Sequence, residues 1–251
     1  SAKRTAARVP LGDGGLMPCI GTVAGLMAGL VLAASEPVVI ATDAPFPAYT
    51  YLDDAGTITG FERDLMDEIC ARALLDCRWT DVTFDQLIPG VMAGDYDVVL
   101  GGLAVTPERR DLVDFTAPYH ATDPDEWYIG RPGAPDPASA LVAVQSGTMQ
   151  EAHLRQMGYR HLSFSTEPEV LAALVAGKVD LALGPFETRA DIRDYIAANG
   201  FDYLYSETIP DEGVAMAVCK GNGALLGTLN TALATIRDDG TLASLENRWF
   251  E

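Results

Sequence analysis

The sequence predicts an α/β fold built from two similar lobes. The segments AGDYDVVLG at 93–101 and AGKVDLALG at 176–184 match at five positions, which hold alanine, glycine, aspartate, leucine and glycine in the same order. Each joins the end of a helical pattern to an apolar strand through a glycine stop. An apolar strand also precedes each copy, VVIAT at 38–42 and LVAVQ at 141–145. Such junctions alone also recur by chance in α/β proteins, but the paired strands favour two α/β lobes over one continuous sheet.

The first 35 residues have the pattern of a signal peptide. Lys3, Arg4 and Arg8 precede an uncharged, mostly apolar run at 19–35. This run is shorter than the roughly 18 residues of a spanning helix, and small residues at its end predict cleavage near Ala34. The alternative is an uncleaved anchor. We expect residues 1–35 to be a leader and the remainder to be exported.

Helical patterns follow the first strand in order. Phe61, Leu65 and Ile69 recur at helical spacing, and the helical pattern that begins near residue 84 stops at Gly94. The second copy stops at Gly177 in the same way. The C-terminal segment is expected to form one helix with an apolar face and, after a glycine stop, another helical turn. Its face residues and stop are Leu225, Leu229, Ala232, Leu233, Ile236 and Gly240.

Composition excludes several classes of function. The 251-residue chain is 48% hydrophobic and carries a formal charge of −19, spread along the chain, which argues against nucleic-acid binding. The three histidines are scattered, and no phosphate loop, GxSxG or CxxC motif occurs, so neither a metal nor a cofactor is expected.

The cysteines suit an exported protein. Cys70 and Cys77 flank the end of a helical pattern and are expected to form a disulfide, worth about 2–3 kcal/mol for so short a loop. Cys219 has no evident partner, and we expect it to be a buried thiol in a strand.

From about Val38 onward the chain resembles the polar amino-acid family of periplasmic binding proteins, especially its lysine/arginine/ornithine and histidine binders. The segments that carry the resemblance are TDAPF at 42–46, GTITGFERDL at 56–65, the run 84–119 and VQSGT at 144–148. Cys70 and Cys77 also coincide with the short disulfide of those binders.

The resemblance implies a type II fold with two lobes joined by a hinge of two strands. Lobe 1 would contain residues 36–120 and 213–251, and residues 121–212 would form the hinge strands and lobe 2. A small ligand would bind between the lobes.

Arg109 is the first binding residue that we expect. The sequence TPER makes Thr106 a helix N-cap and places Arg109 in the first turn. A guanidinium binds a carboxylate through two hydrogen bonds, and the resemblance implies that this arginine holds the α-carboxylate of the ligand. The alternative is a surface ion pair with Asp111 or Glu108, a role that better suits Arg110.

The resemblance also assigns residues around the ligand in lobe 1. Phe46 and Phe84 would flank its aliphatic part, unless they are ordinary core residues. Asp43 would receive a cationic side chain, unless it caps a turn. The site also includes Gly101, Gly102 and Ala104, which follow a strand where relatives usually carry serines. We therefore expect backbone contacts there and a weaker polar shell.

The second lobe contains one departure from the family. Gly147 and Thr148 match a loop that completes the carboxylate site. Where relatives usually carry an aspartate that pairs with the α-ammonium, this chain has Pro185. Glu187 or Asp43 is the candidate substitute, because a buried cation without a partner is costly. Otherwise the ligand is an acylated, cyclic or amino-free carboxylate.

These observations predict a periplasmic, monomeric, non-enzymatic binding protein of an ABC transporter. It would close on an amino acid or related carboxylate and present its closed form to a membrane permease. The alternative is a cyclohexadienyl or arogenate dehydratase on the same fold, for which Glu187 is the candidate acid.

Overall fold

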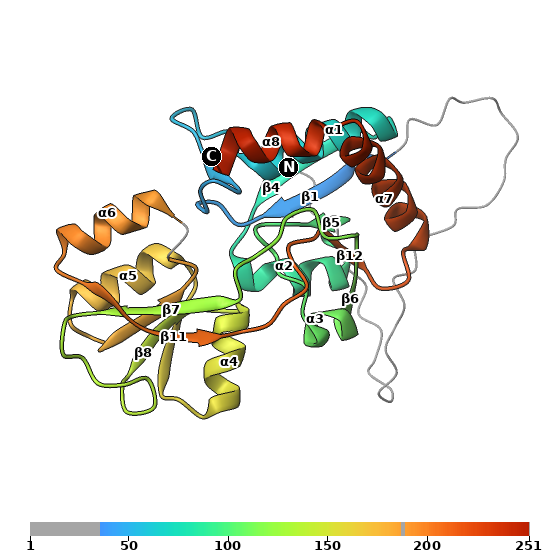
Figure 1. Ribbon diagram of the computed structural model, residues 1–251. Helices are drawn as coiled ribbons and strands as arrows, with labels where there is room; N and C mark the ends of the chain where they lie inside the picture. Colours follow the sequence, from blue (N-terminus) through green and yellow to red (C-terminus); the bar gives the residue numbers. More distant parts are fainter. Residues whose placement is uncertain (1–35, 187–188, 251) are drawn as a thin grey trace, which may run out of the picture.

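The computed structural model describes residues 36–186 and 189–250, which form two α/β lobes. Figure 1 shows the lobes side by side, with the N-terminal and C-terminal parts of the chain together in one of them. The type II, two-lobed fold expected from the sequence is confirmed. The predicted leader, residues 1–35, lies outside the described residues.

The first sheet takes its strands from both ends of the chain. Their order is β4-β1-β5-β12-β6, with β1 parallel to β4 and β5, and β12 antiparallel to its two neighbours. A separate two-stranded ribbon, β2 and β3, lies beside it. The strands are β1 (Val38–Thr42), β2 (Tyr51–Leu52), β3 (Ile58–Thr59), β4 (Cys77–Asp81), β5 (Val98–Val99), β6 (Val113–Phe115) and β12 (Ala217–Cys219).

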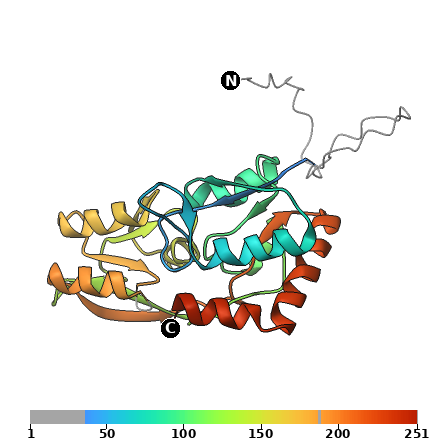
Figure 2. The ribbon, with the colours of Figure 1, turned by 90° about the horizontal axis from the view of Figure 1, so that it is seen from above.

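Helices cover both faces of this sheet because successive strand residues point to opposite sides. Ile40 packs with α1, α7 and α8, whereas Ala41 packs on the side of α2. Figure 2 shows α7 and α8 along one side of this lobe. The helices are α1 (Phe61–Ala73), α2 (Phe84–Ala93), α3 (Pro107–Leu112), α7 (Gly223–Asp238) and α8 (Thr241–Phe250).

The second sheet has the order β11-β7-β10-β8-β9. Val142 and Val144 of β8 pack on the side of α4, and Ala143 packs on the side of α5 and α6. The elements are β7 (Asp125–Gly130), β8 (Val142–Gln145), α4 (Met149–Met157), β9 (His161–Phe164), α5 (Glu167–Val175), β10 (Leu181–Gly184), α6 (Ala190–Ala198) and β11 (Asp202–Thr208).

The sequence repeat corresponds to a repeated strand pair. β1 and β5 are parallel neighbours, with Ile40 opposite Val98. In the second sheet β8 and β10 are parallel neighbours in the same sense, with Val142 opposite Leu181. The two copies of the repeat therefore occupy equivalent places in the two sheets.

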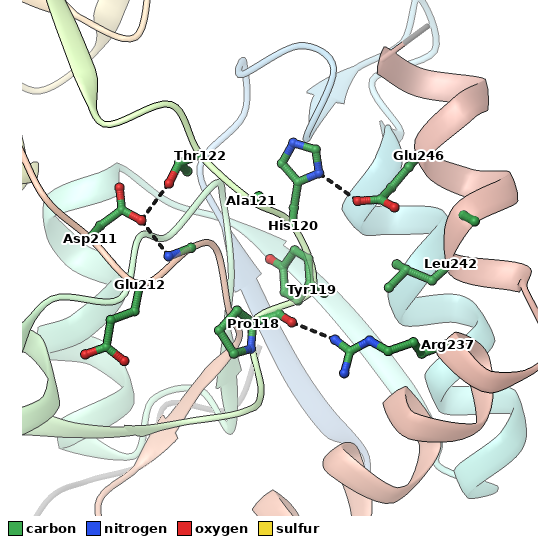
Figure 3. A pocket seen from close by; sticks show the side chains of 12 residues that line it. Pro118, Tyr119, His120, Ala121, Thr122, Asp211, Glu212, Arg237, Leu242 and Glu246 are labelled. Carbon is green, nitrogen blue, oxygen red and sulfur yellow. Dashed lines mark hydrogen bonds and ion pairs between the residues drawn. The ribbon is translucent and has the colours of Figure 1, made fainter.

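Two adjacent segments connect the lobes. The amide of Ile209 donates to the carbonyl of Pro124 at 2.7 Å, and Thr122 Oγ1 donates to Asp211 Oδ1 at 2.6 Å. Figure 3 shows this last bond beside a groove that also contains His120, whose Nδ1 lies 3.0 Å from a Glu246 oxygen. Backbone bonds from the Val214 amide to the His120 carbonyl and from the Tyr119 amide to the Val214 carbonyl join the same two segments on the lobe 1 side.

One cysteine prediction is confirmed and one is wrong. Cys70 and Cys77 form a disulfide, with their Cα atoms 6.3 Å apart, that ties the end of α1 to the start of β4. Cys219 is buried on β12 as expected, but it is disulfide-bonded and is not a free thiol. Pairing depends on distance in space, which the separation of this cysteine in sequence does not show. Among the described helices, none is long and apolar enough to cross a membrane.

Candidate functional site

A cleft of about 560 Å³ lies between the lobes, within the size range of small-molecule sites. It is lined from both sheets, and most of the residues predicted from the sequence lie on its walls. Those residues are Asp43, Phe46, Phe84, Gly101, Gly102, Ala104, Arg109 and Thr148; Pro185 also lines the cleft, and Gly147 lies behind it. Glu187 lies outside the described residues.

Arg109 lies in α3, and its local structure is as predicted. Thr106 is the N-cap, and its side chain accepts a hydrogen bond from the Arg109 amide at 3.3 Å. The guanidinium donates from Nη1 to the carbonyl of Ala104 at 2.7 Å and from Nη2 to the carbonyl of Gly147 at 3.1 Å. It therefore bonds to both lobes and is held rigidly.

The charge of Arg109 has no ion-pair partner among the described residues. The residue is 7% exposed, and no carboxylate of the described residues forms an ion pair with it. Burial lowers the pKa of its guanidinium to about 10, so it stays charged at neutral pH. Arg110 instead forms the surface ion pair, with Glu212 at 2.5 Å. A buried cation without a counter-ion favours an anionic ligand at this point.

Asp43 places a carboxylate on the lobe 1 wall. Gln145 Nε2, from β8 in lobe 2, donates to Asp43 Oδ2 at 2.8 Å across the cleft. Burial raises the pKa of the Asp43 carboxyl to about 6, although the bond from Gln145 lowers it. The contacts of Asp43 and Arg109 with lobe 2 show that the lobes are closed on one another in this structure.

Close packing explains why a glycine stands at position 102. Gly102 has φ +63°, and a Cβ there would lie 2.5 Å from Cε1 of Phe46. Its amide donates at 2.8 Å to Oε1 of Glu62, a fully buried carboxylate that also accepts from the Tyr119 hydroxyl. The amide of Gly102 therefore anchors the loop after β5 to Glu62 and is not available to a ligand.

Phe46 and Phe84, the two predicted aromatic residues, form part of the apolar wall of the cleft. Phe46 stacks on Tyr49 with ring centroids 5.1 Å apart. The guanidinium carbon of Arg109 lies 5.4 Å from the centre of the Phe84 ring, and that of Arg189 lies 5.3 Å from the Phe46 ring. Each ring therefore lies against a guanidinium group at the wall of the cleft.

The loop before α4 approaches lobe 1 closely. Gly147 adopts φ +77°, and a Cβ there would lie 2.8 Å from the Cα of Asp85 in α2. Thr148 is the N-cap of α4, where its hydroxyl accepts from the Glu151 amide at 3.1 Å and donates to the Gln145 carbonyl at 2.7 Å. Its hydroxyl proton is therefore directed into the loop and away from the cleft.

Sequence reasoning missed several cleft residues of lobe 2. Glu126 and Trp127 on β7, Gln150 on α4 and Arg189 before α6 all line the cleft. Arg189 binds both carboxylate oxygens of Glu167 at 2.7 Å. An acidic residue inside a mostly buried strand, as at Glu126, is the one sequence signal that could have indicated part of this set.

Two α/β lobes joined by a double connection, with a buried and uncompensated arginine in the cleft between them, define a two-lobed solute-binding protein. The family model described as bacterial extracellular solute-binding proteins, family 3, matches residues 38–251. The chain belongs to this family.

Known relatives resemble it over most of their length. The L-arginine-binding protein of Pseudomonas aeruginosa is 27% identical over 233 residues, which cover 87% of this chain and 89% of the relative. The lysine/arginine/ornithine-binding periplasmic protein of Escherichia coli is 27% identical over 256 residues, covering 90% of this chain and 94% of the relative.

Solved structures show the same fold. A periplasmic His/Glu/Gln/Arg/opine family-binding protein from Silicibacter pomeroyi, in complex with lysine, has a TM-score of 0.74 and 30% identity, covering 85% of this chain and 96% of that one. The ancestral amino acid-binding protein AncCDT-1, described as a precursor of cyclohexadienyl dehydratase, has a TM-score of 0.70 and 25% identity, covering 86% and 96%.

Proposed function

We propose that this protein is the periplasmic amino-acid-binding component of an ABC transporter. The observation that carries the proposal is the buried charge of Arg109, which has no carboxylate partner among the described residues and lies in a cleft between two lobes. A ligand carboxylate would neutralise it through two charge-assisted hydrogen bonds. The names of the relatives, which specify arginine, lysine, ornithine and histidine, support an amino acid as the ligand.

The proposal includes a division of roles in the cleft. Arg109 would hold the carboxylate, and Phe46 and Phe84 would flank the carbon chain. Asp43 would receive a cationic side chain. The remaining predicted residues, Gly101, Gly102, Ala104, Gly147 and Thr148, would shape the wall through their backbones.

We further propose that the protein acts without catalysis, as a monomer, and that its closed form is what the permease recognises. Residues 1–35 would be removed on export. N-terminal sequencing of the periplasmic form tests the cleavage, and size-exclusion chromatography with light scattering tests the monomer.

A thermal-shift screen followed by calorimetry tests the binding function. The panel contains L-arginine, L-lysine, L-histidine, neutral amino acids and simple carboxylates without an amino group. We expect at least one amino acid to raise the melting temperature and to bind with one-to-one stoichiometry. Silence across the panel, or turnover of a bound compound, would contradict the proposal.

A further inference from the structure

One carboxylate oxygen in the cleft is buried without a partner. Glu126, near the start of β7, is 5% exposed and lines the cleft, and its Oε2 atom takes part in no hydrogen bond. Burial raises the pKa of its carboxyl group to about 7, although the side chain of Gln150 acts to lower it. Among the described side chains, no basic group forms an ion pair with Glu126. Such a carboxylate is stabilised when a cation enters the cleft.

The end of the β7–β10 strand pair brings Glu126 and Pro185 to the same part of the cleft. β7 and β10 are antiparallel, and Trp127 lies opposite Gly184. The pairing ends there, because the chain bends at Pro185, where the Phe186 amide donates to the Gly184 carbonyl at 2.8 Å. Glu126 and Pro185 are the next residues along the two chains, and both line the cleft. The carboxylate of Glu126 therefore lies at the same end of this strand pair as position 185.

We propose that Glu126 binds the ammonium group of an amino acid whose carboxylate is held by Arg109. A carboxylate on β7 then takes the charge-pairing role that Pro185 cannot take. This inference rests on the proposed function, since it requires a ligand that carries both groups. It assigns free amino acids as the ligand class and makes Glu126 the residue that selects them over amine-free carboxylates.

Asp43 is the competing candidate for the ammonium group. Its Oδ2 atom already accepts a hydrogen bond from Gln145 at 2.8 Å, and it lies on the opposite lobe. Glu126 retains a buried oxygen with no bond at all. The unsatisfied oxygen favours Glu126.

Calorimetry at pH 8 with paired probes tests the assignment. Each amino acid is compared with the same molecule lacking the α-amino group: L-arginine with 5-guanidinopentanoate, and L-histidine with 3-(imidazol-4-yl)propanoate. Glu126→Gln removes the charge with little change of shape. A charge-assisted hydrogen bond predicts that this variant binds the amino acid about 10–150-fold more weakly, whereas affinity for the amine-free partner changes less than threefold.

Three further variants complete the design. Asp202→Asn removes an exposed charge of the neighbouring strand β11, outside the cleft lining, and should leave both affinities within threefold. Asp43→Asn tests the competitor. In the background of Glu126→Gln, Pro185→Asp should restore part of the lost amino-acid affinity, because it returns a carboxylate to the cleft from the residue that follows β10.

Proton release on ligand binding can be measured with the unmodified protein, so this test does not depend on a variant that folds. Binding of an ammonium group should expel the proton from Glu126, so at pH 6.5 an amino acid should release more protons than its amine-free partner, measured in two buffers of different ionisation enthalpy. Asp123 and Asp211 are the other carboxylates that act on Glu126, and Asp43 faces the same cleft. Equal proton release from both probes would count against the assignment.

The outcomes separate this inference from the proposed function. Equal weakening of both probes in Glu126→Gln, or an amine-dependent loss in Asp43→Asn alone, would overturn the role of Glu126. Binding of amine-free carboxylates only would overturn it as well, yet would leave a carboxylate-binding protein. Binding of no probe at all would contradict both.

Discussion

Replacing Arg109 by methionine should abolish tight binding while leaving the fold intact. The guanidinium has five N–H donors, and the structure assigns one to Ala104 and one to Gly147. The remaining donors can form two charge-assisted bonds to a ligand carboxylate. At about 1.5–3 kcal/mol each, their loss predicts a weakening of about 3–6 kcal/mol, or roughly 10²–10⁴-fold.

The fold should tolerate this change because methionine fills most of the same volume and no described ion pair is broken. Arg110→Met is the matched control. It removes a neighbouring arginine of the same helix whose partner is Glu212 at the surface, so its effect on affinity should be below threefold. Calorimetry with the best amino acid from the screen measures both variants, and melting curves check the fold. An affinity within threefold of the original in a folded Arg109→Met protein would refute the carboxylate assignment.

Three further predictions concern closure and stability. Gly147→Ala should weaken ligand binding at least tenfold, because its Cβ would meet the Asp85 backbone at 2.8 Å only when the lobes are closed. Gly158→Ala, at φ +71° with open space around it, is the control that carries the backbone strain alone. Burial raises the Glu62 pKa to about 7, so the folded state is destabilised as pH rises from about 4.5 to 7. Urea unfolding of Glu62→Gln should therefore depend less on pH, by up to about 3 kcal/mol, and an unchanged pH profile would contradict this. Cys70→Ser should lower the free energy of unfolding by about 2–3 kcal/mol, and a loss below 1 kcal/mol would show that the disulfide constrains little.

Local patterns in the chain were sufficient for the elements and for one binding residue. The run at 38–42 is a strand because its apolar residues suit a position buried on both faces. The place of Arg109 follows from the N-cap Thr106 three positions earlier. The repeat predicted two lobes because the same strand pair recurs in each sheet. These features depend on neighbours in sequence, and the sequence by itself determined them.

Other features depend on residues that only the folded chain brings together. Examples are the close approach of Phe46 to Gly102 and the bond from Gln145 to Asp43. The disulfide bonding of Cys219 is another. The position of Glu126 is another example, because it depends on the register between β7 and β11, in which it lies opposite Glu207. A shift of one residue would turn its side chain to the other face. Register and lobe closure are set by the packing of whole sheets, and so the tertiary structure alone decided which charges share the cleft.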